Sequence, residues 1–195
     1  EIDQSLSDLI TRSHRGRFIQ DGFKTVLAGR PNAGKSSLLN ALLQEDRAIV
    51  TDMPGTTRDT IEESIRIGGI PLILMDTAGI RDAENQVEAI GIERARKSME
   101  EADLILMVID GSVPLTDEDR RILSSLEGKK AIVILNKYHL QQKAGEAEIR
   151  SLISEETPII HLSAQYGSGI DRLEELIQKL MHTEDLDAGR QLFLT

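Results

Sequence analysis

One segment near the amino end combines glycines with a lysine and a hydroxyl residue, the residue types of a phosphate-binding loop. The pattern G-x-x-x-x-G-K-[ST] is matched by Gly29-Arg-Pro-Asn-Ala-Gly34-Lys35-Ser36. Glycines allow such a loop to wrap tightly, so that backbone N–H groups point inward at phosphate oxygens. In this pattern the lysine reaches the β- and γ-phosphates, and the hydroxyl ligates Mg²⁺. Lys35 and Ser36 are therefore predicted to bind a nucleoside triphosphate with its magnesium ion.

Three further polar motifs each follow an apolar run of strand length. They are Asp76-Thr77-Ala78-Gly79, Asn136-Lys137 and Ser163-Ala164. An acid in the first motif can hold Mg²⁺ through water, and its glycine can offer an N–H to the γ-phosphate. The second and third motifs stand where loops that contact a base belong. Each motif alone is common, but four motifs in this order after four strands favour a guanine nucleotide as the ligand.

The elements that position these motifs alternate along the chain. The predicted strands are short apolar runs, and the predicted helices lie between them. Thr60–Ile67 alternates polar and apolar residues and runs into Gly68-Gly69, which indicates a hairpin and an antiparallel edge strand. We therefore predict an α/β fold with a mostly parallel six-stranded sheet, one antiparallel edge strand and helices on both faces. The other predicted strands are Lys24–Ala28, Pro71–Met75, Asp103–Asp110, Ala131–Asn136 and Pro158–Leu162, and the helices are Lys35–Gln44, Val87–Glu100, Thr116–Leu126, Gly145–Ile153 and Gly169–Met181.

Composition narrows the function further. The 195 residues carry a formal net charge of −10, which argues against gripping nucleic acid through phosphate contacts. The chain has no cysteine, which excludes disulfides, thiolate zinc sites and cysteine nucleophiles and fits a cytoplasmic protein. No apolar stretch is long enough to span a membrane. Because the chain begins at Glu1, we expect a piece of a longer protein, with a helical lead-in over residues 1–21, a nucleotide-binding domain over 22–182 and a tail over 183–195.

The ordered motifs resemble those of translation-factor-related GTPases once Gly55-Thr-Thr-Arg-Asp59 is included. Three local segments resemble the G domain of the MnmE (TrmE) family of tRNA-modification GTPases: Pro31–Ser36, Ile49-Val-Thr-Asp52 and Ile90-Gly-Ile-Glu-Arg94. The resemblance covers about residues 22–180 and implies a P-loop GTPase fold. The Der family of ribosome-assembly GTPases is the alternative, although its members usually have Val where Ala33 stands.

The resemblance implies a role for each motif residue. Mg²⁺ would be ligated by Ser36 and Thr57, and K⁺ by Asn32 with Thr51, Met53 and Thr56. Two G domains would pair face to face as a homodimer across GTP, and the full-length protein would work on tRNA with an FAD-containing MnmG-like partner. The residues expected to bind GTP or GDP are Asn32, Ala33, Gly34, Lys35, Ser36, Ser37, Thr51, Asp52, Met53, Pro54, Gly55, Thr56, Thr57, Asp76, Thr77, Ala78, Gly79, Asn136, Lys137, His139, Ser163, Ala164 and Gln165.

The catalytic residues predicted are Lys35 and Glu88. Ile80 stands where Ras-like proteins have a glutamine that orients water, and an isoleucine cannot polarise water. Glu88, twelve residues beyond Asp76, is the substitute that the resemblance suggests, although an acid is also favoured at a helix start by the dipole. Asn32 likewise suits a simple turn.

One departure from the family pattern concerns base recognition. Guanine is normally read by Asn-Lys-x-Asp, whose carboxylate accepts two hydrogen bonds from the base. Here the run is Asn136-Lys137-Tyr138-His139, and an imidazole cannot act as that double acceptor. Either guanine specificity is weakened or another acceptor substitutes.

Two other function classes stay open at this point. The first is a nucleotide-dependent interaction module with little turnover, and the second is an ATPase or kinase, against which the Asp76–Gly79 and Gly55–Arg58 motifs argue. The folate-binding domain and the carboxyl-terminal cysteine motif of the family are absent from the 195 residues. We therefore expect this chain to hydrolyse the nucleotide without modifying tRNA by itself.

Overall fold

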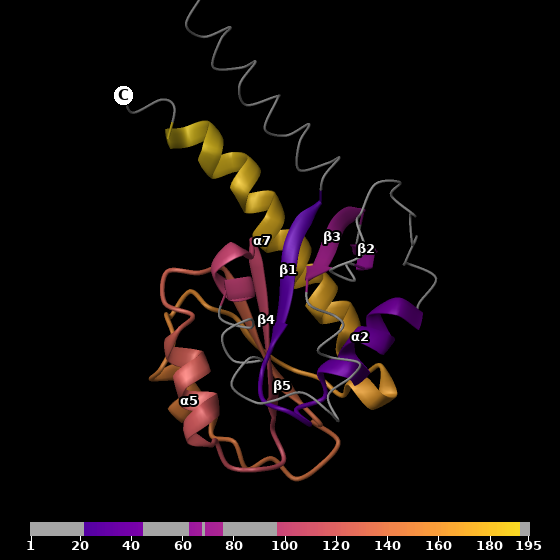
Figure 1. Cartoon of the computed structure of the whole chain (residues 1–195), viewed down its shortest axis with the longest axis vertical. Helices are drawn as coiled ribbons and strands as arrows, with labels where there is room; N and C mark the ends of the chain where they lie inside the picture. Colours follow the sequence, from indigo (N-terminus) through magenta and orange to yellow (C-terminus); the bar gives the residue numbers. More distant parts are fainter. Residues whose placement is uncertain (1–21, 45–62, 68, 76–96, 192–195) are drawn as a thin grey trace, which may run out of the picture.

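The structure is a computed structural model that describes residues 22–44, 63–67, 69–75 and 97–191 (Figure 1). Its sheet contains β1 (Phe23–Ala28), β2 (Glu63–Ile67), β3 (Ile70–Met75), β4 (Leu104–Asp110), β5 (Ala131–Asn136) and β6 (Ile159–His161). The spatial order is β2-β3-β1-β4-β5-β6. Every neighbouring pair is parallel except β2 and β3, which pair antiparallel. The predicted six-stranded sheet with one antiparallel edge strand is confirmed.

The central strands are buried on both faces because helices cover both sides of the sheet. All seven residues of β4 and all six of β5 are buried. Side chains alternate between the faces, so Leu104, Leu106 and Val108 join one apolar cluster. Ile105, Met107 and Ile109 join the other. This double burial explains why these strands are continuous apolar runs in the sequence.

The helices divide between the two faces (Figure 1). On one face lie α2 (Lys35–Gln44) and α7 (Ile170–Gln191), whose leucines and isoleucines share a cluster with β2 and β3. On the other face lie α5 (Asp117–Ser124), α6 (Glu146–Arg150) and the helical residues 97–101, through Leu123, Ile149 and Met99. The arrangement is a three-layer α/β fold.

Helix α5 begins with a capping box, directly after Thr116, where the sequence predicted a helix to start. The Thr116 hydroxyl accepts a hydrogen bond from the Asp119 N–H at 3.2 Å, and the Asp119 carboxylate accepts one from the Thr116 N–H at 2.9 Å. Such a reciprocal pair satisfies two of the backbone donors that a helix start leaves open. It therefore fixes where the β4–α5 loop ends.

Three predicted helices end elsewhere in the structure. Helix α5 ends at Ser124 rather than Leu126. Helix α6 ends at Arg150 rather than Ile153, and the residues that follow form a turn. The Arg150 guanidinium stabilises this turn by donating to the Thr157 carbonyl at 2.7 Å. Helix α7 continues to Gln191 rather than ending at Met181. The prediction ended at Met181 because the apolar residues at helical spacing end there. The helix can continue because the segment that follows contains no proline. The domain boundaries at 21 and 182 stay predictions.

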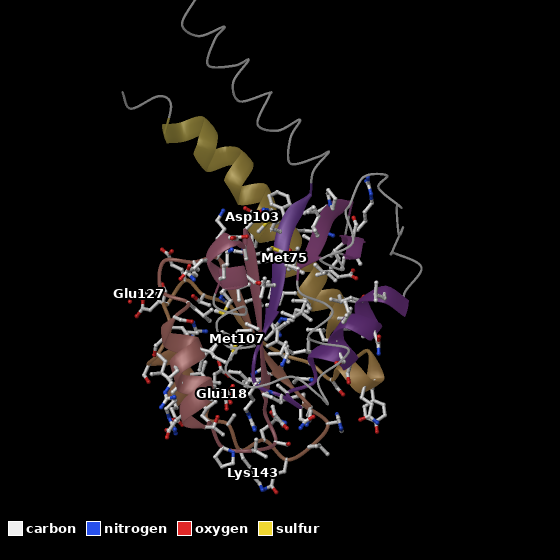
Figure 2. The ribbon with its side chains drawn as sticks, in the orientation of Figure 1. Met75, Asp103, Met107, Glu118, Glu127 and Lys143 are labelled. Atoms are coloured by element: carbon white, nitrogen blue, oxygen red, sulfur yellow. The ribbon has the colours of Figure 1, made fainter. Side chains whose placement is uncertain are left out.

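The carboxyl ends of the parallel strands meet at one edge of the sheet, where loops carry polar groups. Figure 2 shows Asp103 at the amino end of β4, and Glu118 and Lys143 toward the opposite end. Ligands of open α/β sheets bind at this carboxyl edge. No helix among the described residues has the length and apolar character to cross a membrane.

Candidate functional site

The loop between β1 and α2 has the backbone of a tight anion-binding turn. Gly29 and Gly34 have φ values of +134° and +100°, in the region that favours glycine. A Cβ at Gly29 would collide with the Val108 carbonyl, and a Cβ at Gly34 would collide with the Asn136 side chain. Asn32 adopts a φ of +63°, so it does form a turn, and its side chain is exposed. The glycines of the motif are thus required by the packing of this loop against β4 and β5.

The Lys35 side chain is hydrogen-bonded to the backbone of this loop. Its Nζ donates to the carbonyl oxygens of Gly29 at 2.5 Å and Arg30 at 2.8 Å. Burial lowers the pKa of the Lys35 ammonium, and the negative charge of Glu118 opposes that shift. Carbonyl dipoles only partly replace the lost water. A bound polyphosphate would place a full negative charge next to this ammonium, whose present partners are neutral carbonyl oxygens.

Asn136, the last residue of β5, joins the phosphate loop to the turn after β6. Its Nδ2 donates to the Ala33 carbonyl at 3.0 Å, and its Oδ1 accepts the Ala164 N–H at 3.0 Å. The side chain is 2% exposed. Buried polar backbone groups need such partners, so one amide holds two loops at a fixed separation. This connection spans 103 residues of sequence.

Lys137 is held by a carboxylate at the end of β4. Its Nζ donates to Asp110 Oδ2 at 2.6 Å, and Ser112 donates its backbone N–H and its hydroxyl to Asp110 Oδ1. Burial raises the pKa of Asp110, but the hydrogen bonds from Lys137 and Ser112 outweigh it, so the pKa lies below its usual value. Lys137 also has a φ of +61°. The loop that follows β5 is thereby fixed to the loop that follows β4.

His139 faces the turn after β6. Its Nδ1 lies 2.6 Å from the Ser163 Oγ, and its ring meets the Tyr166 ring edge-on at 4.8 Å between centroids. Ser163 is 3% exposed, whereas Tyr166 is 68% exposed. The imidazole is thus fixed by a buried hydroxyl on one side and an open aromatic ring on the other.

The phosphate loop is also tied to helix α5. Arg30 Nε lies 3.2 Å from Asp119 Oδ2, and the two groups form an ion pair without the alignment of a hydrogen bond. The Asp119 side chain is 1% exposed, and its Oδ1 lacks a hydrogen-bond partner within the described residues. The short distance and the burial of the carboxylate make this an ion pair, because a buried carboxylate needs a nearby cation.

The structure brings twelve predicted residues to this carboxyl edge, on the phosphate loop and the loops after β5 and β6. They are Asn32, Ala33, Gly34, Lys35, Ser36, Ser37, Asn136, Lys137, His139, Ser163, Ala164 and Gln165. The other predicted site residues lie outside the described residues: Thr51, Asp52, Met53, Pro54, Gly55, Thr56, Thr57, Asp76, Thr77, Ala78, Gly79 and Glu88. Their roles stay predictions.

Sequence reasoning missed Asp110, Asp119 and Tyr166. Asp110 ends a fully buried strand, and an acid there signals a buried partner. Asp119 lies in the first turn of the helix predicted from Thr116, but nothing in the sequence pointed to Arg30 as its partner. Tyr166 gave no signal, because its ring contact depends on where the two loops meet.

The phosphate loop fits a nucleotide with its magnesium ion. The glycine backbone leaves no Cβ in the cradle, and Ser36 offers a hydroxyl oxygen, a hard ligand of the kind that Mg²⁺ prefers. Among the residues that the structure describes, no group of three or more His, Asp or Glu side chains could hold a metal ion by itself. A metal at this edge would therefore depend on hydroxyl groups and on the ligand's phosphates.

Comparison with known proteins agrees with this geometry. Residues 24–137, more than half of the chain, match the family model described as 50S ribosome-binding GTPase. The chain is 49% identical over 201 residues to the tRNA modification GTPase MnmE of Heliobacterium modesticaldum, covering 100% of this chain and 43% of that protein. It is 50% identical over 180 residues to MnmE of Ligilactobacillus salivarius, covering 92% and 39%. The chain thus spans about two fifths of the curated relatives it matches.

A solved structure is also similar. The G domain of the T. maritima FeoB iron transporter is 27% identical, with a TM-score of 0.55, covering 80% of this chain and 97% of that domain. The fold and the resemblance predicted from the sequence are both confirmed by these matches.

Proposed function

The chain belongs to the 50S ribosome-binding GTPase family and is a GTP hydrolase, and from this premise we propose that it is the G domain of a tRNA-modification GTPase of the MnmE kind. The observation that carries the proposal is the Asn136 amide, which joins the phosphate loop to the two loops at the base end of the site. A nucleotide that spans this edge meets groups already held in place.

Each part of the site has a proposed task. The loop N–H groups around Gly34 and the Lys35 ammonium bind the phosphates, while Lys137, His139 and the Ser163–Gln165 turn line the base. When bound, Mg²⁺ neutralises charge on the phosphate oxygens, and Ser36 with Thr57 would hold it. Glu88 orients the attacking water. Lys35 leaves its loop carbonyls to meet the phosphates.

K⁺ would be held by Asn32 with Thr51, Met53 and Thr56. The exposed Asn32 side chain carries a carbonyl oxygen, the ligand type that such a cation needs. Two copies of the domain would pair across their nucleotides, and the full-length protein would act in the cytoplasm on tRNA with an FAD-containing partner. The names of the relatives, tRNA modification GTPases that span more than twice the length of this chain, support the action on tRNA.

The test is steady-state GTP hydrolysis in KCl and in NaCl at equal ionic strength, over a range of protein concentrations. We expect a rise specific to K⁺ that steepens with protein concentration. Asn32→Gly keeps the positive φ without strain but removes the carbonyl oxygen, so it should hydrolyse GTP equally in both salts.

Equal slow rates in both salts for the unaltered chain would contradict the K⁺ site and the nucleotide-linked dimer. They would favour a nucleotide-dependent interaction module with little turnover. Tight binding of GDP with no turnover under any salt would give the same conclusion.

A further inference from the structure

His139 occupies the position from which a base would be read, and its hydrogen-bonding capacity is limited by the protein itself. We propose that this site does not distinguish guanine from hypoxanthine, so that inosine nucleotides bind about as tightly as guanosine nucleotides. The inference rests on the proposed function, because it takes the ligand to be a purine nucleotide with its phosphates on the loop 29–36.

One nitrogen of the His139 imidazole is already hydrogen-bonded within the protein. Its Nδ1 lies 2.6 Å from the Ser163 Oγ, and Ser163 is itself fixed by its N–H, which donates to the Ser168 carbonyl at 2.9 Å. The Tyr166 ring meets the imidazole at an interplanar angle of 86°. With the ring held by two contacts, Nε2 is the one nitrogen left for a ligand.

A single nitrogen cannot read the edge of guanine. Guanine presents two adjacent donors, N1–H and the 2-amino group, which a carboxylate accepts together. A neutral imidazole has one donor and one acceptor nitrogen, and an imidazolium has no acceptor. If Nδ1–H donates to Ser163, Nε2 accepts one hydrogen bond; if the Ser163 hydroxyl donates to Nδ1, Nε2 is itself a donor. No protonation state of His139 satisfies both guanine donors.

Two other polar side chains near this end of the site, Asn136 and Asp110, are already engaged. The Asn136 amide is used by Ala33 and Ala164. The Asp110 carboxylate is used by Lys137 and Ser112, at 2.6 Å from the Lys137 Nζ and 2.6 Å from the Ser112 hydroxyl. Neither group can move to the 2-amino position without breaking the connections that hold the two loops.

Hypoxanthine has the N1–H and the 6-oxo group of guanine but lacks the 2-amino group. Hypoxanthine therefore needs one hydrogen-bond acceptor, for its N1–H, and His139 offers at most one. Because His139 is exposed, the unpaired 2-amino group of guanine stays hydrated and costs little free energy. The two bases should thus bind about equally well.

The experiment measures the dissociation constants of GDP, IDP and ADP by calorimetry for the 195-residue chain, for His139→Asp and for His139→Asn. For the unaltered chain we expect the GDP and IDP constants to agree within about threefold. His139→Asp restores two acceptors and a charge, so it should favour GDP over IDP by at least about 10-fold, as one charge-assisted hydrogen bond would. His139→Asn, of similar size but uncharged, should keep the ratio of the unaltered chain.

Two results would overturn the inference, and they are distinguishable. A preference for GDP over IDP above about 10-fold in the unaltered chain would mean that another group accepts the 2-amino hydrogens. Failure to bind GDP and IDP at all, or equally tight binding of ADP, would overturn the proposed function as well. If His139→Asp fails to fold, the ratio in the unaltered chain and in His139→Asn still decides.

Discussion

Replacing Asn136 with Ala tests whether its buried amide holds the site together. The substitution removes the partners of the Ala33 carbonyl and the Ala164 N–H, which belong to residues 0% and 6% exposed. An unsatisfied buried polar group costs about 1–3 kcal/mol. Water can enter at the carboxyl edge and reduce that penalty. We therefore expect the free energy of unfolding to fall by about 2–4 kcal/mol, within the usual range for a broken buried network.

The assay is urea unfolding followed by far-ultraviolet circular dichroism, which suits a chain without tryptophan. Asn40→Ala, on the exposed side of α2, is the matched control and should change stability by no more than about 0.5 kcal/mol. If Asn136→Ala is as stable as this control, the amide does not support the two loops.

A double-mutant cycle sharpens the same test. A Cβ at Gly34 would collide with the Asn136 amide nitrogen, so Gly34→Ala should cost less stability when Asn136 is already Ala. The φ of +100° remains strained in both backgrounds, so only the collision is relieved. A coupling free energy above about 1 kcal/mol is expected, and strict additivity would contradict the contact.

Three further predictions concern separate parts of the site. Glu88→Ala should lower kcat for GTP by at least about 100-fold while GTP affinity stays nearly constant, because a water-orienting group acts in the transition state; equal loss of both would show a structural role. Asp110→Asn should cost about 1 kcal/mol of stability at pH 7, since Lys137 is partly exposed. Because the folded pKa of Asp110 is lowered, its contribution is fully present above the unfolded pKa of about 4 and is lost as the pH falls from there through the folded pKa. The stability difference from the unaltered chain should therefore be smaller at pH 3 than at pH 7 in urea unfolding. Arg30→Met should destabilise by about 1–3 kcal/mol in thermal unfolding, because it leaves the 1% exposed Asp119 without its cation; unchanged stability would mean that the ion pair contributes nothing.

The Arg30 prediction has a matched control on the neighbouring helix. Arg121→Met removes an exposed guanidinium from α5 and should change stability by no more than about 0.5 kcal/mol. A loss as large as that of Arg30→Met would point to a general effect of charge on this acidic chain, with its formal net charge of −10.

Much of the fold follows from local patterns. The six strands were predicted within a few residues. The central strands were found because a strand buried on both faces is a continuous apolar run, and the edge strand β2 because it alternates before Gly68-Gly69. The start of α5 follows from Thr116 and Asp119, which satisfy each other's backbone groups over three residues. The phosphate loop follows from its spacing, because glycine tolerates the φ values of +134° at Gly29 and +100° at Gly34.

The sequence therefore determines which segments are strands, where the phosphate loop lies and which residue types stand at the ends of the strands. Only the tertiary structure decides which of these residues meet. The Asn136–Ala33 bond joins residues 103 apart, and the Lys137–Asp110 pair joins residues 27 apart. Such contacts depend on the spatial order β1-β4-β5-β6, which places separate loops side by side at one edge. Periodicity and motif spacing report what a residue requires locally, whereas a buried amide or carboxylate finds its partner only when the sheet has assembled.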